Sequence, residues 1–272
     1  METFIDFFNH LSKPALLLWI FICLGISWIL EAGIPLIKFT YRKWRHDGVN
    51  LVFLSTSLII NSLVGVFSVL VFVWITEKQF GLLNIVDLPL WVELVISVLI
   101  LDLVAQYWVH YLLHRIKWMW KFHLVHHSDT QVDASTGTRH HPGDYLLREI
   151  FGLFAVLIAG IPFAYFLFYK VLTVFFTYLT HANFKTPLWL DSTLGLIFIT
   201  PNMHKFHHHY ERPWTDTNFG NIFSIWDRIF GTLVMDDPRK VRYGLDVLPD
   251  DQSSNLKYQF QVPFDKSVKT DY

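Results

Sequence analysis

Histidine is the residue whose number and spacing in this chain point most directly to chemistry. Seven of the 14 histidines fall between residues 110 and 141, and five more fall between residues 181 and 209. They form three clusters, H-x-x-x-H at 110–114, H-x-x-H-H at 123–127 and H-x-x-H-H at 204–208. Imidazole is a strong ligand for first-row transition metals. Because few other functions explain its recurrence at helical spacing, the pattern predicts a histidine-rich metal site.

The doubled histidines indicate more than one metal. Within each cluster, histidines three or four residues apart share one face of a helix. His126 and His127 are adjacent, so their side chains diverge by roughly 100° on a helix, and the same holds for His207 and His208. One metal cannot easily take both members of such a doublet, whereas two neighbouring metals can. The two doublets therefore predict a dinuclear centre.

Iron is the metal that the sequence favours. Neutral imidazole suits zinc, copper, iron and nickel, but neither H-E-x-x-H of zinc hydrolases nor E-x-x-H of carboxylate di-iron bundles occurs. Iron can also activate oxygen beside an apolar substrate. We expect His209 to extend the third cluster without binding metal and His10 and His46 to lie at the surface. A role for His140 or His141 in metal binding stays open.

The composition indicates a membrane protein. Of the 272 residues 53% are hydrophobic and 17% aromatic, and the mean hydropathy is +0.35, whereas soluble domains contain about 45–50% apolar residues. A formal net charge of −1 and the lack of a basic face argue against a nucleic-acid partner. The single cysteine, Cys23, rules out an intrachain disulfide and a zinc–thiolate site. The first 13 residues show no cleavable signal-peptide pattern.

Apolar runs predict the spans. A hydrocarbon core about 30 Å thick needs about 20 apolar residues in a helix, and such runs lie at 14–37, 51–76 and 88–109. The stretch 150–180 is longer and is interrupted by Gly160 and Pro162, so it forms either one kinked helix or a hairpin of two helices. We favour the hairpin, because it returns His181 to the side of the first two clusters. Arms of about 15 residues, or about 22 Å, should leave its tip short of the far surface.

The loop charges predict the orientation. Residues 38–46 carry four basic side chains and no acidic one, and positive loops stay cytoplasmic. The N-terminus is then outside, and residues 110–148 and 201–272 form a cytoplasmic cap. We therefore expect an all-α integral membrane helical bundle of three spans plus a hairpin, with a histidine-rich catalytic cap. Residues 1–87 would form N-terminal transmembrane helices, and residues 88–272 the catalytic domain.

Six segments together resemble the fatty acid hydroxylase / sterol desaturase superfamily. They are YWVHYLLHR (107–115), WKFHLVHHS (120–128), TRHHPGD (138–144), TPNMHKFHHH (200–209), NFGN (218–221) and WDRIFGT (226–232). The resemblance covers roughly residues 88–250. Members of that superfamily are membrane oxidoreductases that use a non-haem di-iron centre and O2 to hydroxylate or desaturate sterols, acyl chains, alkylglycerols or carotenoids.

The resemblance implies a set of site residues. The family's metal ligands, which are also its catalytic residues, fall on His110, His114, His123, His126, His127, His204, His207 and His208. His181 matches a further metal-binding histidine. Asp102 and Asn183 are candidate acceptors for the outward N–H of a ligating histidine. Arg139 belongs to an R-x-H-P-like element that aligns His141, and Trp226, Asp227 and Arg228 resemble a structural signature.

The function implied is that of a non-haem di-iron lipid monooxygenase with two irons and O2 as co-substrate. The chain has no G-x-G-x-x-G fingerprint, P-loop or cytochrome domain. The electrons would therefore come from a separate ferredoxin, cytochrome or reductase. The alternative is a histidine-rich membrane protein that transports or senses a divalent metal. Transport predicts ligands near the bilayer midplane, whereas these histidines cluster beyond the helix ends.

Overall fold

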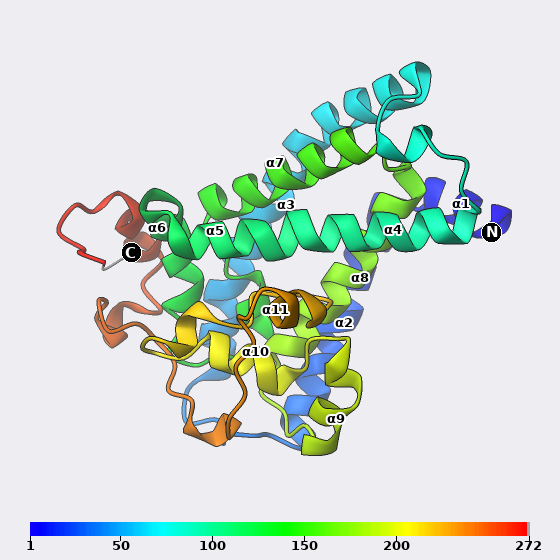
Figure 1. Ribbon diagram of the computed structural model, residues 1–272. Coiled ribbons are helices and arrows are strands. Elements are labelled where there is room, and N and C mark those ends of the chain that lie inside the picture. Colours follow the sequence, from blue (N-terminus) through cyan, green and yellow to red (C-terminus); the bar gives the residue numbers. More distant parts are fainter. Residues whose placement is uncertain (271–272) are drawn as a thin grey trace.

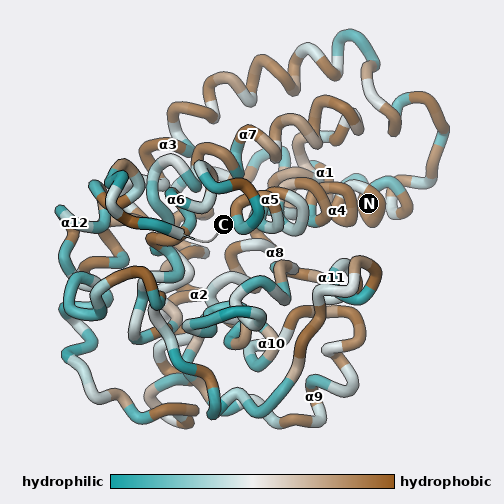
Figure 2. The backbone as a smooth tube through the Cα atoms, turned by 60° about the vertical axis from the view of Figure 1, so that its left-hand side comes forward, coloured by the Kyte–Doolittle hydropathy of each residue, from teal (hydrophilic) through white to brown (hydrophobic). Residues whose placement is uncertain are grey.

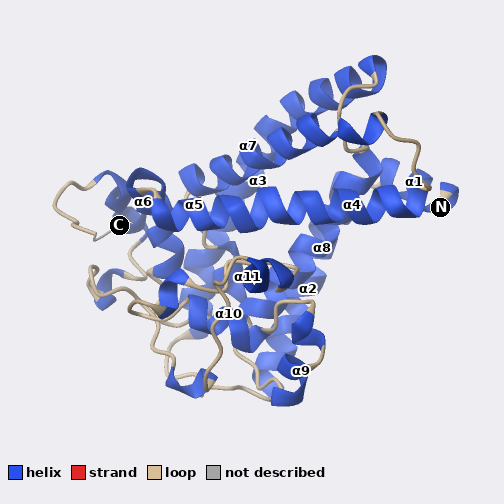
Figure 3. Cartoon of the chain, viewed as in Figure 1, coloured by secondary structure: helices blue, strands red, loops and turns tan. Residues whose placement is uncertain are grey.

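The computed structural model describes residues 1–270, and helices joined by loops make up this part of the chain (Figure 1). No strand occurs among these residues, as the colouring of Figure 3 shows. The only pairing of extended backbone there consists of two isolated bridges, Pro35 with Phe184 and Phe198 with Phe223. The predicted all-α class is confirmed.

Long helices form the body of the molecule. They are α2 (Lys13–Gly33), α3 (Lys43–Lys78), α4 (Leu90–Asp102), α7 (Pro142–Ala159) and α8 (Phe163–His181). α4 continues through a π-helical turn, η2 (Leu103–Trp108), directly into α5 (Val109–Arg115). The shorter helices are α1 (Glu2–Asn9), α6 (Lys117–His127), α9 (Leu188–Ser192), α10 (Pro201–His207), α11 (Ile225–Ile229) and α12 (Leu256–Gln261). Single helical turns are η1 (Leu82–Asn84), η3 (Ala134–Thr138), η4 (Leu194–Leu196), η5 (Trp214–Asp216), η6 (Pro238–Lys240), η7 (Asp250–Gln252) and η8 (Val262–Phe264).

Four helical segments in the described part of the chain are long and apolar enough to cross a membrane. They are 13–33, 43–84, 90–115 and 163–181. The three predicted spans are confirmed, and the fourth segment is the second arm of the predicted hairpin. Apolar side chains such as Ile29, Val66 and Phe67 are more than 60% exposed, as lipid-facing residues would be. α3 has 36 residues and is about 54 Å long, so it exceeds a hydrocarbon core of about 30 Å.

The spans pack in pairs around the hairpin. α3 lies along α7, while α2 and α1 lie along α8, and α4 contacts both arms of the hairpin. Figure 1 shows α3 and α7 side by side, with α4 and α5 forming one long helix across them. Leu101, Val156, Ile161 and Tyr165 are buried in their common core. Figure 2 shows hydrophobic colouring along α3, α4 and α7 and more hydrophilic colouring around α12.

The hairpin turns at Gly160, which has a φ of +72°, and α8 begins directly after Pro162. The predicted hairpin is confirmed, and its buried tip agrees with expectation. Its arms, however, have 18 and 19 residues, or about 27–28 Å. α7 begins eight residues before the apolar run at 150–180, since the first turns of this helix are polar and do not belong to that run. The arms are therefore longer than expected, and the tip contacts Phe80 and Gly81 in the loop that joins α3 to α4.

The glycine at the hairpin tip should be intolerant of a side chain. A Cβ at Gly160 would lie 2.4 Å from the Phe80 carbonyl oxygen, whereas a Cβ at Gly231, whose φ is +69°, would meet nothing within 4 Å. Both alanine variants incur the left-handed backbone cost of about 1 kcal/mol. We expect Gly160→Ala to lose a further roughly 1–3 kcal/mol from overpacking. Thermal unfolding in detergent checks this, and equal melting temperatures for Gly160→Ala and Gly231→Ala would contradict the packing of the tip.

Residues on either side of the spans should label from opposite sides of the membrane. Cys23 is buried and is the only cysteine, so a Cys23→Ser background allows single-cysteine variants. Leu82 and Asp251 are both exposed, and they lie at the hairpin-tip end and in the cap. With the cap in the cytoplasm, Leu82→Cys should react with an impermeant maleimide in intact cells, and Asp251→Cys only after the cells are opened. The reverse pattern would overturn the predicted orientation.

Candidate metal centre

Four helices bring the predicted histidines together at one end of the bundle. His110 and His114 lie one turn apart on α5, and α6 carries the second cluster. Between these helices Ile116 has an extended backbone, with φ −102° and ψ 113°, which ends α5 and lets α6 fold back against it. α10 brings the third cluster to the same place, and His181 is the last residue of α8. The hairpin thus places His181 on the side that the sequence required.

The nine histidines form two groups, each with ligand atoms within 4.8 Å of one another. The five-histidine group is His110, His114, His123, His127 and His207, and the four-histidine group is His126, His181, His204 and His208. Each doublet is divided between the groups, as its divergence on a helix predicted. Every one of the nine side chains is at most 5% exposed. The arrangement therefore consists of two adjacent, buried candidate metal sites.

The spacing of the ring nitrogens suits metal coordination. The Nε2 atoms of His110 and His123 are 3.0 Å apart, and His181 Nε2 lies 3.2 Å from His126 Nε2 and 3.0 Å from His204 Nε2. Two nitrogens that each lie about 2.1 Å from one metal, at right angles, are separated by about 3.0 Å. The nitrogens are thus placed as ligands of common metals would be.

The outward nitrogens of five histidines face hydrogen-bond acceptors. The Nδ1 pairs are His110 with Phe219 O (2.8 Å), His114 with Asp216 (3.2 Å), His123 with Asp144 (3.2 Å), His181 with Thr177 O (2.7 Å) and His207 with Thr217 O (2.8 Å). Each acceptor can fix the tautomer in which Nδ1 carries the proton and Nε2 presents a lone pair to the centre. This is the usual environment of a metal-bound histidine.

Two other histidines have ring nitrogens that no protein group in the described part of the chain satisfies. Both ring nitrogens of His127 and of His208 are buried and have no hydrogen-bond partner within residues 1–270. Burying a polar group without a partner is costly. A metal in each group would engage one nitrogen of each ring. The residues present therefore fit a pair of metal ions.

Burial also keeps the imidazoles of the cap neutral. It lowers the pKa of His123 to about 4, against the opposing effect of the Asp144 carboxylate. Burial and then the neighbouring histidines hold the pKa values of His126, His127 and His207 well below the ordinary value. Neutral imidazole is the form that ligates a metal, so this part of the site is ready to bind at neutral pH.

The WDRIFGT segment supports the site through the backbone. Asp227 accepts hydrogen bonds from the N–H groups of Phe219 (2.8 Å) and Gly220 (2.9 Å). It thereby holds the loop whose Phe219 carbonyl faces His110. Asp102 was expected to accept from a histidine, but it accepts from the backbone of Ile222 and Phe223 and from Trp226 Nε1. Its effect on the site is therefore indirect.

The predictions for Asn183 and Arg139 also change. The Asn183 side chain bonds to both backbone groups of Ile37, so it joins two chain segments and is not seen to accept from a histidine within residues 1–270. Arg139 is fully buried and donates to Val125 O (2.9 Å), in the middle of the second cluster, and to Ser253 O. It therefore fixes the backbone of α6. These roles depend on contacts between distant segments, which the sequence does not display.

The structure separates the two histidines that the sequence left open. His141 stacks on Phe122 and its Nδ1 accepts from Gly143 N, so it caps α7 and lies outside both groups. His140 instead stacks on His126, with ring centroids 4.6 Å apart, so it lies beside the four-histidine group. The residue that sequence reasoning missed is Asp144, which bonds to both His123 and His140. Its i,i+4 spacing from His140 was the available signal.

His46 was expected to lie at the surface, but it does not. It is buried, and its Nε2 lies 2.9 Å from both carboxylate oxygens of Asp129, two residues after the second cluster. His46, Asp47 and Asp133 are also close enough together to hold a metal. There, however, the Lys43 ammonium already lies 2.8 Å from Asp133 and supplies the positive charge. Lys43 and His46 thus belong to a buried network that ties α3 to the cap. His10 is exposed, as predicted.

Comparison with known proteins agrees with this geometry. Residues 94–232, which are 139 of the 272, match the model of the fatty acid hydroxylase family. The chain belongs to that family. The family region begins in α4 and ends just after α11, so it contains all nine grouped histidines. No solved structure matches the chain.

Several curated relatives of this chain have names that specify a lipid. The chain is 31% identical to an ornithine lipid hydroxylase of Rhizobium tropici, over 53% of this chain and 42% of the relative. It is 32% identical to the human alkylglycerol monooxygenase, over 59% of this chain and 34% of the relative. A methylsterol monooxygenase of Arabidopsis thaliana is 26% identical over 57% of this chain. The chain thus spans less than half the length of the first two relatives.

Neighbouring histidines provide a matched test of the ligand set. His207 belongs to the five-histidine group, whereas His209 lies outside both groups and its Nδ1 faces Arg242 N. We expect His207→Ala to lose bound metal, because removing a ligand weakens coordination, and His209→Ala to retain it. Elemental analysis of the purified variants after iron-supplemented growth measures this, with melting temperature as the check on folding. Equal metal content in both variants would exclude His207 as a ligand.

Proposed function

We propose that the protein is a non-haem di-iron monooxygenase that hydroxylates, or desaturates, a C–H bond of a membrane lipid. The observation that carries the proposal is the division of nine buried histidines into two adjacent groups of candidate ligands. Membership of the fatty acid hydroxylase family supports it. The five-histidine group would hold one iron, and the four-histidine group the other.

The relatives support a lipid as the substrate. Their names specify an ornithine lipid, an alkylglycerol and a methylsterol, which are chemically diverse but all partition into membranes. In this chain, the candidate metal centre lies at the end of four segments that are apolar enough to span a bilayer. A lipid could therefore reach it from the membrane without crossing water.

When bound, the two irons would supply the activation of O2; with two external electrons and two protons, one oxygen atom enters the substrate in hydroxylation and the other leaves as water. The chain's own residues hold and orient the ligands. Asp144, Thr177 O and Phe219 O fix the outward face of the imidazoles. Burial of all nine rings excludes bulk water from the centre, which protects a reactive site from side reactions.

A separate protein would supply the electrons, because the chain has no recognisable redox-cofactor motif. We propose that a ferredoxin, cytochrome or reductase docks on the cap, and that the cap faces the cytoplasm, in line with the basic residues at 38–46. The alternative of a divalent-metal transporter fits less well. Its ligands should lie near the middle of the spans, whereas His110 and His181 lie within the last turns of theirs.

Metal content and oxygen incorporation test this proposal. We expect about two irons per chain, because each doublet divides between two groups. We also expect lipids of cells that express the protein under ¹⁸O2 to gain a labelled oxygen atom, or a new double bond if the reaction is desaturation, while lipids of cells that express His207→Ala gain neither. Mass spectrometry of the extracted lipids provides the measurement. One tightly held zinc and no iron after iron-supplemented anaerobic purification would refute the oxygenase assignment.

A further inference from the structure

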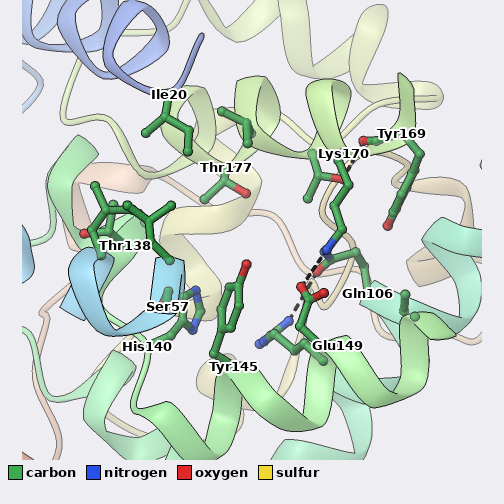
Figure 4. Close-up of a pocket in the computed structure, with 18 of the residues that line it drawn as sticks. Ile20, Ser57, Gln106, Thr138, His140, Tyr145, Glu149, Tyr169, Lys170 and Thr177 are labelled. Atoms are coloured by element: carbon green, nitrogen blue, oxygen red, sulfur yellow. Dashed lines mark hydrogen bonds and ion pairs between the residues drawn. The ribbon is translucent and has the colours of Figure 1, made fainter. Parts of the chain in front are cut away.

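A cavity of about 170 Å³ lies between the spans and is lined by residues of α2, α3, η2, η3, α7 and α8 (Figure 4). A single water needs only about 10–15 Å³ by such a measure, so the space can take part of a larger molecule. Its walls include apolar side chains such as Ile20, Leu54 and Phe166 and several polar ones. Mixed walls of this kind are typical of ligand sites, where a few polar groups fix orientation.

One end of the cavity adjoins the four-histidine group. His140 lines the cavity and stacks on His126, with ring centroids 4.6 Å apart and nearly parallel planes. Thr177 also lines it, and its carbonyl oxygen lies 2.7 Å from His181 Nδ1. A molecule in the cavity would therefore end beside the candidate metal centre.

The deeper part holds an ion pair between the arms of the hairpin. Lys170 Nζ lies 2.5 Å from Glu149 Oε1, and Figure 4 shows the two side chains meeting across the cavity, with Tyr145 beside them. Ionisable residues within a membrane are costly and are functional by default. Ser57 also lines the cavity, and its buried hydroxyl has no hydrogen-bond partner in the part of the chain described. The cavity thus offers an unpartnered hydroxyl and an ion pair to a ligand.

The charges around the cavity balance. Besides Lys170 and Glu149, Arg148 lines it and is paired at 3.0 Å with Asp144, which lies outside the lining, so each of the two cations already has a carboxylate partner. An anionic group would have to displace Glu149, leaving an uncompensated buried charge, which is strongly unfavourable. A hydroxyl can donate to Glu149 and accept from Lys170 at the same time. The pair is therefore matched to an uncharged polar group.

Distance along α8 gives the length of the molecule that would fit. Lys170 and His181 are 11 residues apart, which is three turns of helix and about 16 Å, so they lie on one face of α8. Thr173 and Thr177, between them, also line the cavity. A ligand that reaches from the ion pair to the histidines is long and lies along this face.

We propose that this cavity binds the lipid substrate as a long-chain molecule with an uncharged hydroxyl group seated on the Lys170–Glu149 pair, and that this pair discriminates against acids. The inference rests on the proposed function only in identifying the bound molecule as the substrate. Binding places the hydroxyl deep between the hairpin arms and presents a carbon far from it to the four-histidine group. Lys170 and Glu149 are in this view specificity-determining residues.

Equilibrium binding of two matched probes tests the inference. Radiolabelled hexadecan-1-ol and hexadecanoate are compared at pH 8.5 on the purified, anaerobic, metal-loaded protein without reductant. The native protein should prefer the alcohol by about tenfold or more, the effect of one charge-assisted hydrogen bond. Glu149→Gln leaves Lys170 without a carboxylate partner. The affinity of this variant for hexadecanoate should therefore rise by about tenfold. Lys170→Met should weaken both probes.

Two controls separate selectivity from misfolding. Lys240→Met removes an exposed lysine paired with Asp236 and should bind both probes as the native protein does. The double variant Lys170→Met/Glu149→Gln has no buried charge to leave uncompensated, and it should keep its metal but lose the preference for the alcohol. A preference that is unchanged in Glu149→Gln and the double variant would overturn the inference, even if lipids are hydroxylated. Selective binding without incorporation of ¹⁸O would instead refute only the oxygenase assignment.

Discussion

The neutral lone pairs of nine imidazoles can converge on one place only if the opposite side of each ring is anchored and water is kept out. Much of the structure serves that requirement. α5, α6, α8 and α10 supply the rings, while backbone carbonyls such as Phe219 O and Thr217 O receive the outward nitrogens. Asp227 and Asp102 in turn hold the loop that offers these carbonyls. The surrounding charges therefore support geometry more than they take part in chemistry.

Helical periodicity and hydropathy were sufficient for the gross architecture. The histidine clusters required His181 to return to their side, which predicted the hairpin at Gly160 more firmly than the apolar pattern did. The same method failed where polar residues enter a helix. α7 begins at Pro142, capped by His141, and its first turns carry the paired Asp144 and Arg148; a hydropathy window excludes such polar turns. The arms predicted from the sequence were consequently shorter than those in the structure.

The candidate site was predictable in its ligand types but not in its supports. Spacing alone divided each doublet between two sites, because adjacent residues on a helix must diverge. The partners of the outward nitrogens come instead from residues up to 109 positions away, and nothing in the local sequence marks a backbone carbonyl as an acceptor. His46 illustrates the same limit: its carboxylate partner, Asp129, lies 83 residues away, so a histidine among basic residues resembled a surface position.

The π-helical turn η2 has a consequence for how proteins of this kind can diversify. The turn lies between α4 and α5, and its Ala105 and Gln106 line the cavity while His110 follows on α5. A π turn is an α-helix with an extra residue, and one residue corresponds to about 100° of rotation. Deleting a residue there would turn α5 away from the other histidines, whereas substituting Ala105 or Gln106 would reshape the cavity and leave the helix register unchanged. The sequence on the α4 side of the turn can therefore vary, provided that the length of the turn is kept, because that length fixes the orientation of the α5 histidines.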